Sequence, residues 1–516
     1  MFLTLRTIMK ERAEKYFPFI LIFLLLLGTL LRFTYACQFR STVFFNPVLM
    51  DRHDQKTFHL WAKQIQAHPW YVDGKVFYMA PLYPYFLALL YTISGDNIFF
   101  VLCFQLILDV LLCLFLYLLG TIIGGRKVGI LAALFGCFYR TFIVYASTVL
   151  SDSLILFLYT AFILSLYSAL RKPALVRWML VGFLLGLSAL AKPTIGIYLP
   201  FLLLGLLLQK SEALVPGNIR GKNLLVFLLV VAISGLVILP VTMRNLFVAG
   251  EFVPICSNGP VNWAIGNSSD SLGLFCYPRG RLLMPWSVDF WKLQLVKTIL
   301  FFTSYEWPQN LNVYLIEEVL PTLKLGFVHF GLVVPIGLGG LVLMFSAWRK
   351  NFLFLSFTLS NIAWVIMFFV TDRYRLPAVA CLMVSAAYCL VWSFSHLKSK
   401  WKIATVLWMG ISLFAYFFNT TPGPRIPDVY LKIFASLTKK NVPYDLARND
   451  WKKAYQEALT YVRLQPQSPD AHFLLACVFQ QTGRQKEAVQ ALRKTLQLDP
   501  GFEAAKKFLE DLGESL

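Results

Sequence analysis

Apolar runs separated by short polar segments fill most of the first 420 residues. About 20 apolar residues are enough for a helix to cross the hydrocarbon core of a bilayer. The runs lie at residues 17–36, 98–120, 128–146, 153–170, 176–191, 194–209, 223–241, 326–346, 352–370, 376–395 and 402–419. The first run resembles a signal peptide, but its length and the lack of a small-residue cleavage pattern favour a spanning helix. The pattern predicts an all-α polytopic membrane protein with about eleven transmembrane helices.

Basic residues gather in alternate segments between these runs. Six such segments fall on one side: the N-terminus, 125–127, 171–177, 210–222, 348–350 and 396–402. Short loops rich in Lys and Arg stay in the cytoplasm. We therefore predict a cytoplasmic N-terminus and a C-terminus on the periplasmic or lumenal side. Two long loops, residues 37–97 and 242–325, then face outward.

The first outward loop contains two helical patterns. Phe58, Trp61, Ala62 and Ile65 follow Asp54 at helical spacing, which predicts a short amphipathic helix that begins at Asp54. A second helix is predicted from Pro81 to about Ser94. Helices of this kind lie along a membrane surface.

The composition changes after residue 420. Pro466 and Pro500 stand 34 positions apart, and each closes a similar phrase. This spacing, with Ala476, Phe479 and Gly483 between them, predicts a small α-helical tail of tetratricopeptide repeats, which present a concave surface to protein partners. The predicted domains are residues 1–420 in the membrane, a linker at 421–448 and the repeats at 449–516.

Composition narrows the functional classes. The 516 residues are 58% hydrophobic and only 14% charged, whereas about a quarter of an ordinary soluble protein is charged. The net charge of +20 lies mostly in the short loops, and no basic helix with interleaved aromatic residues suggests nucleic acid. Among the cysteines, Cys256 and Cys276 share one outward loop, so a disulfide between them is one alternative.

The densest cluster of ionisable groups in the N-terminal half is Asp51-Arg52-His53-Asp54. Carboxylates beside a bilayer are costly to keep, so the loop is a candidate active site. Asp54 is interpreted as a general base that takes a proton from an acceptor, although Asp also commonly caps a helix. A divalent metal on His and Asp is a further alternative, but no second ligand cluster supports it, and no cofactor is expected.

A second acidic residue and four cations lie at the outward ends of the predicted spans. Asp152 begins one span and faces either its own helix end or the same cavity as Asp54. The cations either reach lipid headgroups or converge on a phosphate. They are Lys192, Arg244, Arg373 and Arg375.

Together these stretches resemble the GT-C membrane glycosyltransferases that use polyprenyl-phosphate sugars, the superfamily of protein O-mannosyltransferases and the lipid A aminoarabinose transferase. The resemblance covers about residues 15 to 400. Its stretches are 54–62, 80–88, 150–152, Leu190-Ala191-Lys192-Pro193, Arg244-Asn245 leading to 261–267, and Arg373-Tyr374-Arg375-Leu376-Pro377. Relatives often carry Tyr at the position of Phe58 and Glu at that of Asp152.

The resemblance implies that Asp54 acts as the base or orients the acceptor, and that Asp152 is the second-loop acidic residue. We further predict that Asp51 or Asp152 helps to hold the acceptor and that the four cations bind the donor phosphate. The matched stretches add Phe58, His59, Tyr83, Asn245, Asn267 and Tyr374 to the acceptor and loop regions, and the ionisable cluster of the first outward loop adds His53. The predicted reaction moves a sugar from a polyprenyl-phosphate donor to a protein or glycolipid acceptor, in a bacterial inner membrane rather than the endoplasmic reticulum. Two alternatives stay open: a transporter or flippase of a lipid-linked or anionic solute, and an inactive scaffold that recruits partners through the repeats.

Overall fold

The computed structural model describes residues 2–49, 53–70, 72, 74–209, 222–275, 280–397, 399–419, 442, 446 and 451–514. Contacts divide the chain into two compact units. The first comprises residues 1–36 and 57–422, and the second comprises residues 37–56 and 423–516. Asp51 and Cys276 lie outside the described residues.

Every predicted apolar run is helical. The helices are α1 (Phe2–Phe39), α4 (Ile98–Gly124), α5 (Arg126–Phe138), α6 (Arg140–Ala146), α7 (Asp152–Arg171), α8 (Leu175–Ala191), η3 (Pro193–Tyr198) with α9 (Leu199–Leu207), α10 (Lys222–Ala249), α14 (Phe330–Phe345), α15 (Trp348–Met367), α16 (Asp372–His396) and α17 (Trp401–Asn419). Among the described residues, seven helices are long and apolar enough to cross a membrane. They are α1, α4, α7, α10, α15, α16 and α17. The chain is therefore a helical membrane protein, and the count of eleven spans stays a prediction.

Helix α16 lies at the centre of the bundle. It packs against α14, α5, α15, α4 and α7, and 78% of its most apolar window is buried, against 11% for α17. Glycine permits the closest of these contacts, because a Cβ at Gly340 of α14 would lie 1.9 Å from the carbonyl oxygen of Ser385. The residues at the start of α16 therefore have a fixed position in the bundle.

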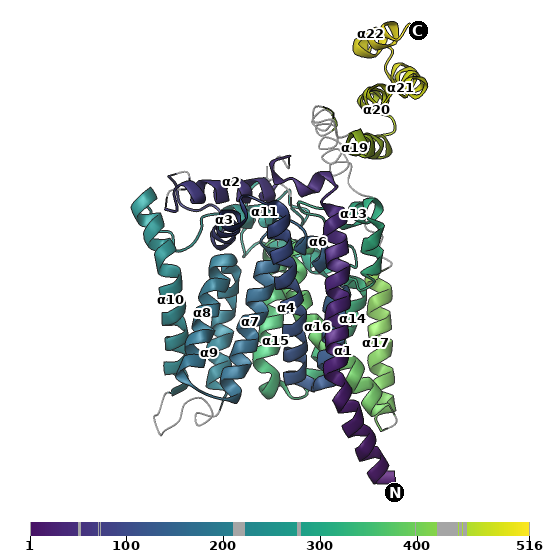
Figure 1. The fold of residues 1–516 in the computed structure, drawn as a ribbon. Helices are drawn as coiled ribbons and strands as arrows, with labels where there is room; N and C mark the ends of the chain where they lie inside the picture. The colour runs from purple at the N-terminus through teal and green to yellow at the C-terminus, as the bar shows by residue number, and fades with distance from the viewer. Residues whose placement is uncertain are drawn as a thin grey trace. The chain divides into compact units, whose positions relative to one another are not determined.

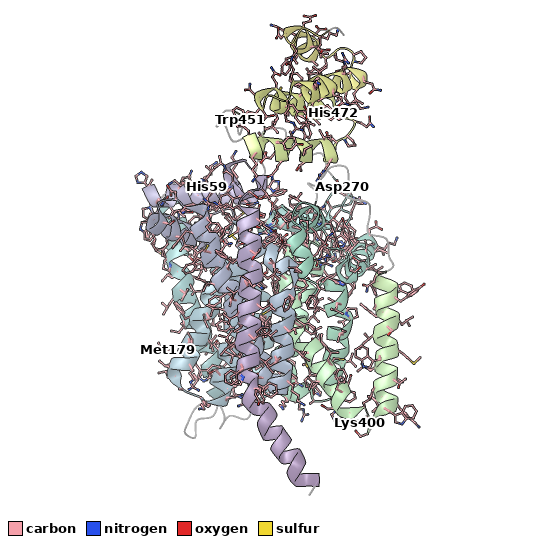
Figure 2. The ribbon with its side chains drawn as sticks, turned by 45° about the vertical axis from the view of Figure 1, so that its right-hand side comes forward. His59, Met179, Asp270, Lys400, Trp451 and His472 are labelled. Atoms are coloured by element: carbon pink, nitrogen blue, oxygen red, sulfur yellow. The ribbon has the colours of Figure 1, made fainter. Side chains whose placement is uncertain are left out.

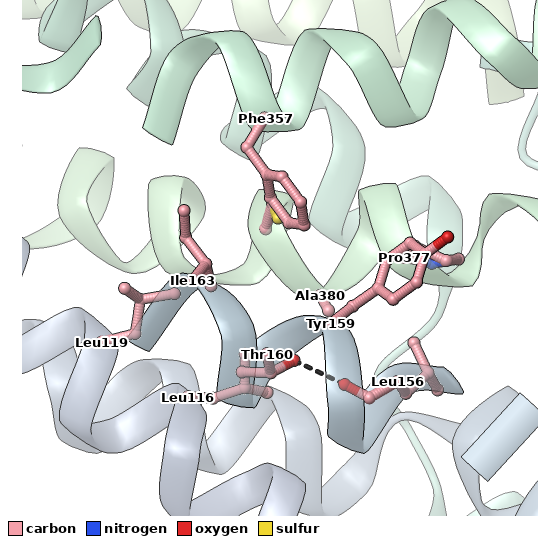
Figure 3. Close-up of a pocket in the computed structure, with 10 residues that line it drawn as sticks. Leu116, Leu119, Leu156, Tyr159, Thr160, Ile163, Phe357, Pro377 and Ala380 are labelled. Carbon is pink, nitrogen blue, oxygen red and sulfur yellow. Dashed lines mark hydrogen bonds between the residues drawn. The ribbon is translucent and has the colours of Figure 1, made fainter. Parts of the chain in front are cut away.

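The bundle interior is closely packed. One small cavity, of about 10 Å³, lies where α4, α7, α15 and α16 meet, among Leu116, Tyr159, Phe357 and Pro377 (Figure 3). That volume is about the minimum for one water molecule. This cavity has no room for a substrate.

Short helices gather at one end of the bundle, opposite the N-terminus (Figure 1). They are α3 (Leu82–Ser94), α11 (Gly259–Asn267) and α13 (Val313–Val319). Figure 2 shows His59 and Asp270 at this end, and Lys400, from a predicted cytoplasmic loop, at the other. We call this the outer end.

Both helices predicted in the first outward loop are confirmed. Helix α2 (Asp54–Ala67) begins at Asp54, and Phe58, Trp61 and Ile65 are buried along one face. Helix α3 ends at Gly95, whose φ of 64° is the left-handed conformation that favours glycine after a helix. Helical periodicity alone was sufficient here because each helix buries one continuous stripe.

The second unit holds the C-terminal helices α19 (Trp451–Leu464), α20 (Pro469–Gln481), α21 (Gln485–Leu498) and α22 (Glu503–Asp511). Helices α20 and α21 pack as a pair around Ala476, Phe479 and Leu492. Gly483 turns the chain between them with a φ of 73°. This pair occupies the predicted repeat, and its identity as a tetratricopeptide repeat stays a prediction.

Candidate active site

A buried ion pair joins two of the predicted site residues at the outer end. The Nε of Arg373 lies 3.0 and 3.2 Å from the two carboxylate oxygens of Asp152, and each side chain is about 5% exposed or less. Asp152 is the first residue of α7 and Arg373 the second of α16. The positive end of the α7 dipole favours the carboxylate there. The pair therefore fixes the starts of two central helices to each other.

Lys192 completes this cluster from a third helix. It follows the last residue of α8, and its Nζ lies 4.2 Å from the ring centre of Trp364 and 4.1 Å from that of Tyr374. An ammonium group over an aromatic face is stabilised by the ring quadrupole. Burial lowers the pKa of Lys192 to about 7, while the nearby charges of Asp152 and Arg373 act in opposite directions. We call Asp152, Lys192, Arg373 and Tyr374 the outer cluster.

Tyr145 and Asp372 hold the backbone beneath Arg373. The hydroxyl of Tyr145 donates to Oδ1 of Asp372 at 2.9 Å. The same oxygen accepts from the Arg373 amide, and the Asp372 amide donates to the carbonyl of Trp307. Both side chains are buried. Position 373 is thus fixed by its neighbours, while its side chain extends to Asp152.

Arg375 lies in a buried network of protein acceptors. Its guanidinium pairs with Glu306 at 3.0 Å and donates to the carbonyls of Phe301, Thr303 and Tyr305. Both members of the pair are fully buried. In this structure the donors of Arg375 bind the outward loop, so these contacts favour a structural function, and its role in phosphate binding stays a prediction.

Arg244 and Asn245 also bind protein acceptors in this structure, and their predicted roles at the donor phosphate and the acceptor stay predictions. Arg244, near the end of α10, donates to the carbonyls of Trp70, Val72 and Lys75 in the first outward loop. The Asn245 amide donates to the carbonyls of Val253 and Ile255. These contacts explain the Arg-Asn pair as a clamp between α10 and both outward loops.

Asn267 belongs to a second clamp that the sequence did not reveal. Its Oδ1 accepts from Lys297 Nζ at 2.9 Å, and the same Nζ donates to the carbonyls of Gly266, Met367 and Phe368. Lys297 lies in α12 (Val288–Phe302) and is fully buried. The clamp ties α11 and α12 to the outer end of α15.

The aromatic residues of the first outward loop connect to the loop that carries Asp152. Phe58 and Tyr83 pack edge to face, with their ring centres 5.0 Å apart. The hydroxyl of Tyr83 donates to Gln105 at 2.6 Å, and the Gln105 amide donates to the carbonyls of Ala146 and Thr148. Gln105 therefore links α3 to the segment just before Asp152.

The remaining predicted residues lie in or near α2. His59 contacts the hydroxyl of Tyr91 through Nδ1 at 2.8 Å. Asp54 and His53 are half-buried at the start of α2 and belong to the second compact unit. Asp51 lies outside the described residues, as does Cys276, so the roles of these residues and the disulfide stay predictions. No group of three or more metal-binding side chains occurs in the described part of the chain.

Several site residues were not predicted from the sequence: Trp364, Tyr145, Asp372, Gln105, Glu306 and Lys297. Glu306 and Lys297 are ionisable residues in an outward loop of a chain with few charges. That scarcity is the one sequence signal by which they could have been found. Trp364 lies inside an apolar run, where an aromatic residue is ordinary. Its contact with Lys192 depends on how α15 is rotated.

Comparison with known proteins supports a membrane glycosyltransferase. The family model described as dolichyl-phosphate-mannose-protein mannosyltransferase matches residues 78–242, a part that includes Tyr83, Asp152 and Lys192. A search of curated proteins found no match. The chain is thus similar to this family over its central part.

The chain is also similar to solved structures of the oligosaccharyltransferase from Archaeoglobus fulgidus. The apo form gives a TM-score of 0.49 at 14% identity and covers 78% of this chain and 54% of that chain. The form in complex with an inhibitory peptide and a dolichol-phosphate gives 0.47 at 16% identity, with 86% and 60% coverage. This chain therefore spans little more than half the length of those proteins.

Proposed function

We propose that this protein transfers a sugar from a polyprenyl-phosphate donor to an acceptor on the periplasmic or lumenal face of a membrane. The observation that carries the proposal is the outer cluster, in which Lys192, Arg373 and Asp152 meet at the ends of three helices. Two cations beside a carboxylate fit a phosphate leaving group. The family match over residues 78–242 agrees with this chemistry.

The reaction is a displacement at the anomeric carbon, and we propose that it inverts the configuration there. The acceptor oxygen or nitrogen forms a bond to that carbon and gives its proton to the carboxylate of Asp54. The bond between the anomeric carbon and the phosphate oxygen breaks, and its electron pair leaves with the phosphate. Lys192 and Arg373 stabilise the charge that develops on this oxygen.

Each group has a proposed role in that step. Asp54 acts as general base, a function that typically contributes about 10²–10⁴-fold to rate. Asp51 or Asp152 helps to hold the acceptor. Arg373 offers a planar guanidinium to phosphate, whereas Lys192 offers a point charge on Tyr374 and Trp364. The reaction as written needs no metal or cofactor.

The acceptor is proposed to be a protein or a glycolipid. Stacked helix pairs of tetratricopeptide repeats present a concave surface. We propose that α20 and α21 form such a repeat and that the tail recruits a protein acceptor or partner. In this proposal the N-terminus is cytoplasmic and the tail lies on the opposite side of the membrane. The membrane is proposed to be the bacterial inner membrane rather than the endoplasmic reticulum.

The test is turnover of lipid-linked sugars by the full chain in lipid nanodiscs. A panel of polyprenyl-phosphate sugars is offered with peptide and glycolipid acceptors, to the wild type and to Asp54→Asn. We expect consumption of one donor by the wild type and a loss of about 100-fold or more in the variant. Asp289→Asn is the matched control, because Asp289 pairs with Lys292 on the exposed face of α12. Wild-type rates in Asp54→Asn would refute Asp54 as the base.

A further inference from the structure

Arg373 has two anions to bind in this account. The structure places its Nε 3.0 and 3.2 Å from the carboxylate oxygens of Asp152, and the proposed function assigns the same guanidinium to the donor phosphate. Lys192 differs, because its Nζ lies over two aromatic rings. A phosphate that enters beside Lys192 therefore meets an arginine already paired with a carboxylate.

The charge of the phosphate changes during the reaction. A sugar phosphodiester carries one negative charge, whereas the monoester product carries about 1.5 to 2 near neutral pH, as phosphate monoesters on proteins do. Two cations that stabilise the developing charge also hold this product more tightly than the donor. In many enzymes the release of product limits turnover. A site with these cations needs a means to release the lipid phosphate.

We propose that Asp152 is this means: its carboxylate competes with the lipid phosphate for Arg373 and so promotes release of the polyprenyl-phosphate product. This inference rests on the proposed function. When a donor binds, its phosphate displaces Asp152 from Arg373. After transfer, Asp152 takes Arg373 back and the product dissociates.

The surroundings of the pair allow such an exchange. Asp372 and Tyr145 hold the backbone at Arg373, and the Tyr374 amide donates to the hydroxyl of Thr371. We therefore expect the exchange to require only side-chain rotation. Removing one partner of a buried ion pair leaves the other charge uncompensated, at a cost of about 3–5 kcal/mol. Here the charge of Lys192 acts on Asp152 as well, and we expect it to do so still when a phosphate displaces the carboxylate. Neither Asp152 nor Arg373 is left without an opposite charge in either state.

The distinguishing experiment measures binding of a radiolabelled C55 polyprenyl phosphate to the full chain in nanodiscs. The proteins are the wild type, Asp152→Asn, Arg373→Gln and the double variant, with Asp289→Asn as the carboxylate control. Polyprenol of the same length and inorganic phosphate serve as competitors, to separate the lipid from the phosphate. Asn retains the size and the helix-start preference of Asp, and size-exclusion profiles check folding.

We expect Asp152→Asn to bind the polyprenyl phosphate about tenfold more tightly than the wild type, which corresponds to about 1.4 kcal/mol of lost competition. Arg373→Gln binds more weakly, and adding Asp152→Asn to it changes nothing further. The product then inhibits Asp152→Asn more strongly than the wild type. The control matches the wild type.

Unchanged or weaker binding by Asp152→Asn would overturn the inference and leave the phosphate site intact, because Asp152 would then merely orient Arg373. Equal gains in Asp152→Asn and in the double variant would also overturn it. Failure of the wild type to bind the lipid phosphate would remove the proposed function as well. If inorganic phosphate competes as well as the lipid phosphate does, the site binds phosphate without recognising the polyprenyl group. That result would overturn the assignment of a lipid phosphate.

Discussion

The buried pair of Arg375 and Glu306 allows the structural role of Arg375 to be separated from a phosphate-binding one. Replacing Glu306 by Gln removes the negative charge and keeps a side chain of the same shape. Oε1 of Glu306 accepts from the hydroxyls of Tyr139 at 3.1 Å and Thr141 at 3.0 Å, and a Gln oxygen retains those bonds. The change therefore removes the charge and the acceptor oxygen that face Arg375.

The expected loss follows from the environment of the pair. Breaking a buried ion pair costs about 3–5 kcal/mol, because one charge stays uncompensated. Three carbonyl groups also accept from Arg375, so we expect the lower value, about 3 kcal/mol. Glu306→Ala also leaves two buried hydroxyls without their acceptor, at roughly 1–3 kcal/mol each. Ala is therefore expected to be worse than Gln.

Thermal unfolding in detergent, followed by intrinsic fluorescence, measures this effect. A loss of 1 kcal/mol lowers the midpoint by roughly 2–4 °C in a domain of 150–250 residues and by less in a longer chain. Glu306→Gln is thus expected to lower the apparent midpoint by about 3–6 °C. Asp289→Asn, an exposed pair on α12, should leave it unchanged.

Measuring the binding of polyprenyl phosphate separates a structural role of Arg375 from a phosphate-binding one. If Arg375 is structural, Glu306→Gln lowers the stability of the protein and leaves the affinity of the folded fraction for polyprenyl phosphate nearly unchanged. A stable Glu306→Gln protein with altered phosphate affinity would refute this interpretation and return Arg375 to the phosphate site.

Three further predictions concern the outer cluster and the two links beside it. Because the pKa of Lys192 is lowered to about 7, its ammonium form is lost as the pH rises through this value, so phosphate affinity should fall between pH 7 and 9; Lys192→Arg should abolish that fall, and an identical pH profile would contradict the assignment. Gln105→Leu removes the donors to the carbonyls of Ala146 and Thr148, so turnover should drop several-fold in steady-state assays with phosphate affinity retained; unchanged turnover would exclude a positioning role. Lys297→Met leaves four buried acceptors without this donor, so the stability should fall by about 3 kcal/mol and limited proteolysis should cleave the loop at 242–325 sooner; wild-type resistance would contradict the clamp.

The fold followed from the sequence where the signal was local. Apolar runs predicted the long helices of the bundle, and the spacing of Phe58, Trp61 and Ile65 predicted the buried face of α2. The helices of the second outward loop, α11, α12 and α13, were not predicted. The count of eleven spans stays a prediction. The stretch predicted as one run at 128–146 forms the two short helices α5 and α6. A break after residue 138 depends on packing, which periodicity does not report.

The site followed in part. The alternation of basic loops predicted that Asp152, Lys192 and Arg373 lie at the outward ends of three spans. In the structure these three residues lie close together. The same reasoning grouped Arg244 and Arg375 with them, yet both donate to backbone carbonyls. A sequence shows a cation but not the path of the loop beside it, and that path decides which arginine has protein acceptors.

The most direct test of the central claim is a mass balance with the full chain in sealed vesicles that contain the preferred lipid-linked sugar and an acceptor. We predict that each mole of donor consumed yields one mole of polyprenyl phosphate and one mole of glycosylated acceptor, and that Asp54→Asn lowers the rate of formation of both products by about 100-fold or more. A donor pool that stays intact, whether it remains in place or moves between leaflets, would contradict the transferase and favour a transporter.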